Sequence, residues 1–470
     1  MRGVIFGLLV CCGVADAAAN PWVAMTAGDV QAMHDALEAN HPGPVDPQNP
    51  GFRSWLESGL QQAMQRAAEA RSLQDYERTL TFYANGFNDN HTGISFHNAP
   101  RFDAWPGFVV GPADGAVVVV HAEADAGVAT GAKLVSCGGE PLDALLKGRT
   151  DPYFWRAVIP HQRFERAYHL FYQAADDPQP ALKSCAFSSG PIVLSWRKTA
   201  DADFQKVLLA ARGLAPRPPS LRQIDGVWFV SIPTFGYQTD EEVAQIHAVI
   251  DALGKREPEL RQATLVFDLR GNGGGNSEWG TAIVKAVWGE AWEQRAEALS
   301  GGFTVDWRAS ANNLATVTAA EQQIHKVGLD SDWLQPVIAA ITKAKHEGKP
   351  LARVVDPSPK IDPLPPPDPV TGRVYFLADG ACASACLDFA DLMHNLPGVT
   401  EIGLPTSADT NYIDIASMEL PSGLARLGYG MKVYRDRVRG SNVWYEPKAR
   451  WPSGDMTDDA AVVRWIKTLP

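Results

Sequence analysis

Ser384 stands among small residues, between a strand predicted over 373–378 and a helix predicted to continue to about residue 392. A hydroxyl at a helix N-terminus lies at the positive end of the helix dipole, which favours negative charge that develops beside it. The neighbours Ala383 and Ala385 would let a substrate backbone approach closely. The position suits a nucleophilic serine, although an N-capping serine would occupy the same place.

A glycine-rich turn over residues 270–275 follows a buried strand predicted over Thr264–Leu269. Consecutive glycines expose backbone N–H groups, which can bind an anion or the oxyanion of a tetrahedral intermediate. A P-loop is disfavoured because no Lys-Ser/Thr pair follows. A tight turn that needs positive φ angles is the alternative.

His91 lies in a polar loop before the alternating run Thr92–Phe96. An imidazole can accept and return a proton near neutral pH, as a general base and acid must. A turn histidine on the surface is the alternative. Each of the three segments is weak when taken alone, and their joint occurrence is far more specific.

Together, these segments resemble the C-terminal-processing (tail-specific) serine peptidase family, in its tricorn-core-like, His-containing branch. The family's D-L-R-x-N-x-G-G turn is matched by residues 268–275, and its Ser-Ala pair by residues 384–385. Its Asp-Gly-His-Thr motif is matched by residues 89–92, with Asn90 in place of Gly. Asparagine tolerates the left-handed conformation that glycine would supply there. The run over 131–146 is similar to the family's PDZ-like module.

The resemblance implies a role for each matched residue. Ser384 would be the nucleophile and His91 the general base. The oxyanion would be bound by the N–H of Ala385 and by that of Gly273 or Gly274.

The family activates its serine either with a lysine some two dozen residues later or with a histidine and an acidic partner. This chain has no lysine from Ala385 to Met431. The first one, Lys432, lies in the alternating run Leu427–Tyr434, which predicts a strand with this side chain toward solvent. The sequence therefore favours a Ser–His mechanism.

Glu446 is the candidate for the acidic partner, since the family's acid lies roughly sixty residues after the serine. The alternative is that Glu446 is a surface residue beside Pro447 with no catalytic role. His394 is a weaker candidate base, because it lies on the same predicted helix as Ser384 and about 15 Å along its axis.

Apolar spacing predicts helices within Val30–Leu37, Trp55–Ala70 and Gln74–Tyr83, and short strands follow from Phe108 to about Arg197. From Val227 onward, strands and helices alternate, which predicts an α/β domain. The expected fold class is α/β multidomain. The resemblance implies a crotonase-like (repeated ββα) protease domain with a PDZ-like β module and a helical N-terminal segment. The expected divisions are a signal peptide over 1–19, a helical domain over 20–100, the PDZ-like module over 101–212, a linker over 213–222 and the protease domain over 223–470.

Composition and charge limit the classes of binding partner and the compartment that can be expected for this protein. The 42 Lys and Arg against 54 Asp and Glu give a net charge of −12, which argues against nucleic acid. The first 19 residues have one basic residue, a short apolar run and small residues at a possible cleavage site, as a secretory signal does. No later run is long and apolar enough to suggest stable membrane insertion. We expect an exported protein, periplasmic or secreted.

Four cysteines follow the predicted signal peptide. Cys137 and Cys185 fall in one predicted module and are a candidate disulfide for an oxidising compartment. Cys382 and Cys386 could pair, stay reduced or simply pack. No spacing typical of a metal site occurs, and no cofactor is implied.

We therefore expect an exported serine endopeptidase that cleaves peptide bonds through an acyl-enzyme and binds its peptide or protein substrate as an added strand. The alternative is a catalytically inactive protein that binds a peptide or a hydrophobic ligand on the same fold.

Overall fold

The computed structural model describes residues 20–97, 102–113, 115–174, 177, 179–213, 217–326, 331–355, 361, 364–367, 370–452 and 456–470. The signal peptide predicted over residues 1–19 lies outside them. Within these ranges, every helix is too short or too polar to cross a membrane.

Three helices open the described chain: α1 (Pro21–Asn40), α2 (Pro50–Ala68) and α3 (Leu73–Asn85), with a short 3₁₀ turn η1 (Gly43–Val45) after α1. Their starts follow the capping rules. Asn20 accepts a hydrogen bond from the N–H of Trp22, and Ser72 accepts one from Asp75. Proline begins α1 and α2, where its missing N–H leaves no helical bond unmade. The three helices coincide with the stretches that apolar spacing predicts.

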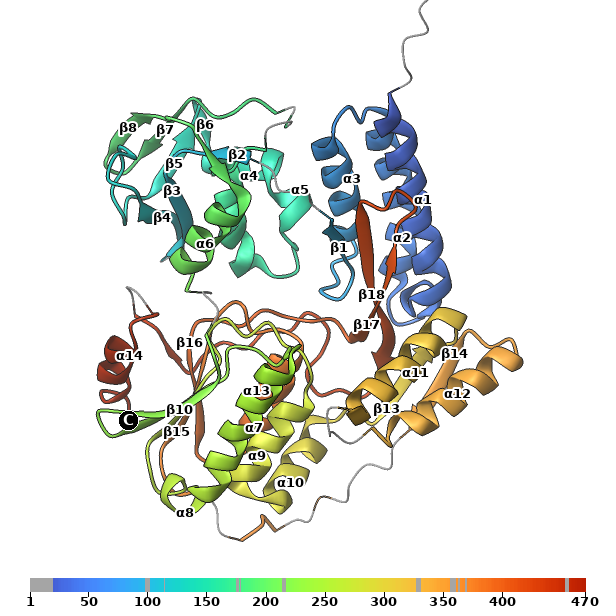
Figure 1. The fold of residues 1–470 in the computed structure, drawn as a ribbon, viewed down its shortest axis with the longest axis vertical. Coiled ribbons are helices and arrows are strands. Elements are labelled where there is room, and N and C mark those ends of the chain that lie inside the picture. Colours follow the sequence, from blue (N-terminus) through green and yellow to red (C-terminus); the bar gives the residue numbers. More distant parts are fainter. Residues whose placement is uncertain are drawn as a thin grey trace, which may run out of the picture.

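These helices pack against a five-stranded antiparallel sheet built from distant parts of the chain (Figure 1). The strand order is β1 (Gly93–Phe96), β18 (Ala425–Tyr434), β13 (Thr304–Arg308) and β14 (Leu351–Val355), and β17 (Tyr412–Glu419) also pairs with β18. Helices α11 (Ala311–Lys326) and α12 (Leu334–His346) join the same core.

One hydrophobic cluster runs through this layer and includes Leu37, Leu80, Trp307, Ile341 and Tyr429. The N-terminal segment, expected as a domain over 20–100, therefore shares its core with strands and helices from residues 304–434. Apolar spacing along the sequence cannot reveal such long-range strand pairing.

The middle module has a core of its own, around Val110, Leu146 and Phe171. Its elements are β2 (Phe102–Trp105), β3 (Phe108–Ala113), β4 (Ala116–Ala122), β5 (Leu134–Cys137), β6 (Glu140–Pro141), α4 (Leu142–Arg149), α5 (Asp151–Phe154), η2 (Pro160–Phe171), β7 (Ser184–Phe187), β8 (Gly190–Val193), β9 (Arg197–Ala200) and α6 (Asp201–Ala211). The strands form pairs β2-β9 and β3-β4 and a sheet in the order β6-β5-β7-β8. A disulfide joins Cys137 to Cys185, which lie opposite each other on β5 and β7.

The third layer is a six-stranded sheet in the order β10 (Ser220–Ile224), β11 (Val227–Ser231), β12 (Leu265–Asp268), β15 (Val374–Ala378), β16 (Val399–Gly403) and β19 (Ala449–Arg450). All neighbours are parallel except β10 and β11. Residues 220–222, expected in the linker, belong to strand β10.

Helices cover both faces of this sheet because its strands are apolar on both sides. Helices α7 (Asp240–Lys255), α8 (Glu257–Leu260), α9 (Glu278–Trp288), α10 (Glu290–Ser300) and α13 (Ala385–His394) share one cluster with Val230, Phe267 and Phe376. The alternate residues Phe229, Val266 and others form a second cluster with α14 (Asp459–Ile466).

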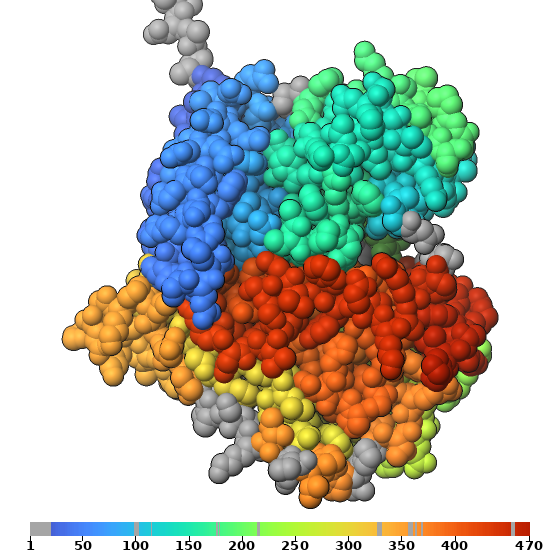
Figure 2. Space-filling model, turned by 180° about the vertical axis from the view of Figure 1, so that it is seen from behind, coloured from blue at the N-terminus to red at the C-terminus, as the bar shows by residue number. Residues whose placement is uncertain are grey.

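The carboxyl ends of the parallel strands bring together the loops that follow residues 231, 268, 378 and 403. Ligands of open α/β sheets bind outside this edge. Seen from behind, the chain beyond about residue 400 forms a band directly below the N-terminal helices and the middle module (Figure 2). The site is therefore expected where this edge of the parallel sheet meets the N-terminal helices and the middle module.

The Cys137–Cys185 bond closes a loop between residues 48 apart in the sequence, and such bonds typically stabilise by about 2–4 kcal/mol. We expect Cys137→Ala/Cys185→Ala to lower the free energy of unfolding of the middle module by that amount in urea denaturation. Mass mapping without reduction should recover a peptide that joins the two segments. Free thiols at both positions in the native protein would contradict this prediction.

Candidate active site

Ser384 lies in the turn between β15 and α13, at the N-cap position of that helix. Its backbone has φ 53° and ψ −126°, in the positive-φ region that non-glycine residues seldom adopt. Such conformations persist only when surrounding contacts hold them, and they are frequent at functional sites. The side chain is half-buried, so it stays accessible.

His91 faces this serine from the loop between α3 and β1. Its Nε2 lies 3.2 Å from Ser384 Oγ, although the two residues are 293 positions apart. The imidazole is buried. Its other nitrogen, Nδ1, is buried and has no hydrogen-bond partner within the described part of the chain. The two residues that the sequence motifs single out are thus in hydrogen-bonding reach.

Asp89 organises the loop before His91. Its carboxylate accepts hydrogen bonds from the His91 N–H at 3.2 Å, from Thr92 Oγ1 at 2.7 Å and from Thr410 Oγ1 at 2.6 Å. His41 Nε2 lies 3.4 Å from it. Burial acts to raise the pKa of Asp89, but the neighbouring imidazole of His41 and the hydroxyl of Thr410 outweigh burial, and the net pKa is lowered. Asp89 is therefore ionised when it accepts the backbone N–H of His91.

The glycine-rich turn approaches the serine from the other side. A Cβ on Gly274 would lie 2.7 Å from Ser384 Cβ and 2.6 Å from the carbonyl oxygen of Ala383, and Gly274 has φ +102°. Only glycine fits this position. The turn is stiffened by Asn272, whose buried amide donates to the Ile232 carbonyl and accepts from the Gly274 N–H at 2.9 Å.

The three candidate oxyanion donors are therefore not equivalent. The N–H of Gly274 is already donated to Asn272. Among the residues that the structure describes, neither Gly273 nor Ala385 donates its N–H to another group. The Ala385 N–H lies directly beside Gly274.

Cys382 and Cys386 form a disulfide that spans the serine. Both cysteines are fully buried. The sequence left this pairing open.

Glu446 does not meet His91. Its side chain is exposed, and its carboxylate accepts a hydrogen bond from Trp444 Nε1 at 3.1 Å. The candidate acidic partner of His91 is therefore not beside the imidazole in this structure. His394 pairs with Glu401 at 3.0 Å near the far end of α13, away from the serine.

Lys432 was expected to point to solvent, and this is wrong. The side chain is buried, 2.9 Å from Asp414 Oδ2, and its ammonium lies over the rings of Trp307, Trp333 and Tyr434. Burial alone would lower its pKa, but Asp414 outweighs burial and the net pKa is raised. A lysine held protonated in this way cannot act as a general base.

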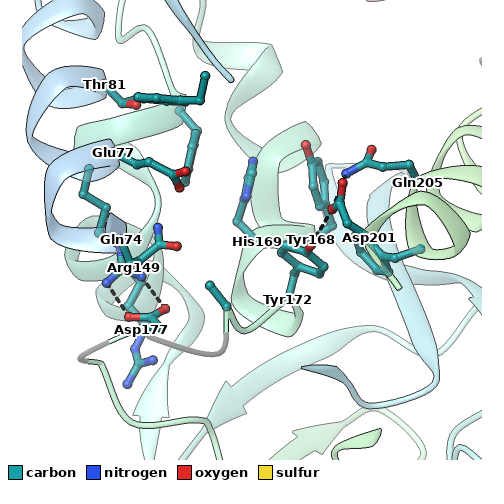
Figure 3. Close-up of a pocket in the computed structure, with 15 residues that line it drawn as sticks. Gln74, Glu77, Thr81, Arg149, Tyr168, His169, Tyr172, Asp177, Asp201 and Gln205 are labelled. Carbon is teal, nitrogen blue, oxygen red and sulfur yellow. Dashed lines mark hydrogen bonds and ion pairs between the residues drawn. The ribbon is translucent and has the colours of Figure 1, made fainter. Parts of the chain in front are cut away.

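A cavity of about 250 Å³ lies elsewhere, between α3 and the middle module (Figure 3). Glu77 and Thr81 reach it from α3, and His169 and Tyr172 from the end of η2. Neither Ser384 nor His91 lines it.

The fold is similar to that of mature CPAF. A structure of mature CPAF complexed with lactacystin matches with a TM-score of 0.60 and 14% sequence identity, over 95% of this chain and 98% of that chain. A second structure of mature CPAF has a TM-score of 0.60 and 13% identity, over 92% and 93%. A photosystem II D1 C-terminal processing protease has a TM-score of 0.38 and 12% identity, over 93% and 96%. No protein-family model and no curated protein matches the chain.

The likeness with a TM-score above 0.5 is to the structures of mature CPAF, and it covers nine-tenths or more of this chain. At this level of identity the likeness establishes the fold, a mixed α/β multidomain architecture.

Gly274→Ala tests the close approach of the glycine turn. We expect the added methyl group to displace Ser384, so that its labelling by a fluorophosphonate slows by about 10²-fold, as a displacement of about 1 Å can do. Gly226→Ala is the matched control, since Gly226 also has positive φ (+83°) but open space around its Cβ. The control should lose about 1 kcal/mol of stability and keep the labelling rate. Equal rates in the two variants would show that the approach does not position Ser384.

Proposed function

We propose that this protein is a serine endopeptidase that cleaves peptide bonds through an acyl-enzyme, with Ser384 as nucleophile and His91 as general base. The observation that carries the proposal is the 3.2 Å contact between Ser384 Oγ and His91 Nε2. It joins two segments that the sequence motifs single out independently, at a serine with positive φ.

In the proposed mechanism, His91 Nε2 removes the proton of Ser384 as Oγ attacks the carbonyl carbon of the scissile bond. The imidazolium then returns this proton to the leaving amine, which leaves an ester on Ser384. Water, activated by the same nitrogen, hydrolyses the ester and frees the serine.

The N–H groups of Gly273 and Ala385 are the favoured donors to the oxyanion, because that of Gly274 is engaged by Asn272. Each such donor typically lowers the barrier by about 3 kcal/mol. The role of Gly274 is to let the glycine-rich turn approach the turn that carries Ser384.

The peptide substrate is proposed to bind as an extended strand, with backbone hydrogen bonds that supply affinity. The PDZ-like assignment of residues 101–212 and the crotonase-like assignment of 223–470 are kept as proposals. The separate core of the middle module and the parallel sheet of the third layer support them. Export through a leader over residues 1–19 is likewise kept as a proposal.

Ser384→Ala and His91→Ala should each remove most peptidase activity while the melting temperature is retained. Their combined loss should be about equal to either single loss, because nucleophile and base act as one unit. Peptide hydrolysis by the two single variants and the double variant measures this. Fluorophosphonate labelling of the wild type but not of Ser384→Ala supports the enzyme, and no labelling would favour a binding protein. Additive losses would contradict the proposed coupling.

The identity of the base is tested by pH and by Lys432. We expect kcat/KM to fall as pH decreases through about 6 to 7, the range in which imidazoles protonate. Lys432→Met should lower stability by about 2 kcal/mol, because it leaves Asp414 without its partner, yet the folded variant should keep most of its activity. An inactive but folded Lys432→Met together with an active His91→Gln would exclude the histidine mechanism.

A further inference from the structure

Asp409 lies in the loop 404–411 that follows β16, and its side chain is fully buried. Its two carboxylate oxygens bond to two different segments. Oδ2 accepts the backbone N–H of Ser384 at 2.5 Å, and Oδ1 accepts Asn90 Nδ2 at 3.1 Å. One carboxylate therefore links the residue before His91 to the serine that His91 faces.

On the serine side, this bond fixes the peptide plane between Ala383 and Ser384. A serine with φ near +53° is unfavourable by itself and needs a contact that holds it. With its N–H bound to Asp409, the residue can rotate little about φ, and Oγ keeps its direction toward Nε2.

On the histidine side, the segment 409–410 holds both residues that precede His91. Asp409 binds the Asn90 side chain, and Thr410 donates to Asp89. Asn90 was expected to matter through a left-handed backbone, but it is not among the non-glycine residues with positive φ. Its side chain supplies the contact instead, and the glycine of the family motif has no such group.

The charge of Asp409 strengthens both bonds. The Arg439 guanidinium lies near this carboxylate, with NH1 4.0 Å from Oδ2, and the charge of Arg156 also acts on it, so two cations offset Asp409 without a close ion pair. Hydrogen bonds to an ionised acceptor are roughly twice as strong as neutral ones.

We propose that Asp409 is a positioning residue that sets the distance between Ser384 Oγ and His91 Nε2, a role that rests on the proposed peptidase function. It touches neither the reacting atoms nor His91. It acts through the Ser384 backbone and the Asn90 side chain.

Asp409→Asn tests the role, because the neutral amide lacks the charge that strengthens both bonds and can bind Asn90 only if the Asn90 amide turns over to present its oxygen. We expect kcat and the rate of fluorophosphonate labelling to fall by about 10- to 100-fold, with KM changed less than about twofold because substrate contacts are untouched. Asn90→Ala breaks the same bridge from its other end and should reduce kcat in the same direction without altering the buried carboxylate.

Asp29→Asn is the matched control. Asp29 is also buried, accepts a backbone N–H (from Ser422) and a side-chain donor (Tyr76), and bridges segments far apart in the sequence. It lies in the N-terminal helix layer and contacts neither Ser384 nor the His91 loop. The control should lose thermal stability yet keep kcat. A loss of kcat in Asp409→Asn no greater than that in the control would overturn the proposal.

The double variant Asn90→Asp/Asp409→Asn reverses the bridge. The amide at 409 can accept the Ser384 N–H through its oxygen and donate its NH₂ to the carboxylate at 90. We expect kcat to recover at least about tenfold over Asp409→Asn, beyond any change that melting temperature explains. No recovery in a folded double variant would count against the bridge.

Measurements on the wild-type enzyme distinguish a failure of the proposed peptidase function from a failure of the positioning role of Asp409. If fluorophosphonate labels wild-type Ser384 but no peptide is cleaved, the proposed peptidase function fails, while the labelling rates of the variants still test Asp409. If wild-type cleavage is present and Asp409→Asn matches the control, only the positioning role fails.

Discussion

The distance between Ser384 Oγ and His91 Nε2 is the constraint on which the rest of the arrangement depends. His91 belongs to the helix layer and the antiparallel sheet, whereas Ser384 belongs to the parallel sheet, and these layers have separate hydrophobic cores. A site of this kind works only if its geometry is held to about 0.5 Å. One link between the layers is the loop 404–411, where the chain leaves β16 and enters β17. Asp409 and Thr410 lie on that loop, so the residues that bind both partners also lie on a connection between their layers.

Burial makes these contacts decisive. Asp89 and Asp409 are almost fully removed from water, and a buried carboxylate is unfavourable unless donors and cations replace its hydration. Asp89 obtains its donors from the His91 loop and from Thr410, and the His41 imidazole lies 3.4 Å from its carboxylate. Asp409 obtains its donors from Ser384 and Asn90. Each carboxylate is satisfied only when separate segments are docked together, so the charges favour the same arrangement that brings base and nucleophile into contact.

The parts of the site that could be predicted are those encoded in short runs. Ser384, His91 and the glycine turn stand in local motifs, and strands β11, β12 and β15 are plain apolar runs. The shared core of α1–α3 with β13, β17 and β18 could not be predicted, because pairing over hundreds of residues leaves no periodic trace. Lys432 shows the same limit, since alternation along its strand cannot show that Asp414 and aromatic rings from other elements enclose it. Asp409 is a single acidic residue in a loop, and no spacing distinguishes it. Glu446 was selected by distance along the chain, which does not determine distance in space.

Three contacts restrain the Ser384 turn, and they act on different degrees of freedom. The Cys382–Cys386 bond limits how far the ends of the turn can separate, but both sulfurs lie on the same segment, so it cannot fix where that segment lies relative to His91. Gly274 admits the neighbouring turn within contact distance, and it limits motion of Ser384 toward that side only. Asp409 alone among the three also binds the His91 loop. A covalent restraint can therefore preserve the local bend of Ser384, while a pair of hydrogen bonds to one buried carboxylate determines whether that bend faces its base.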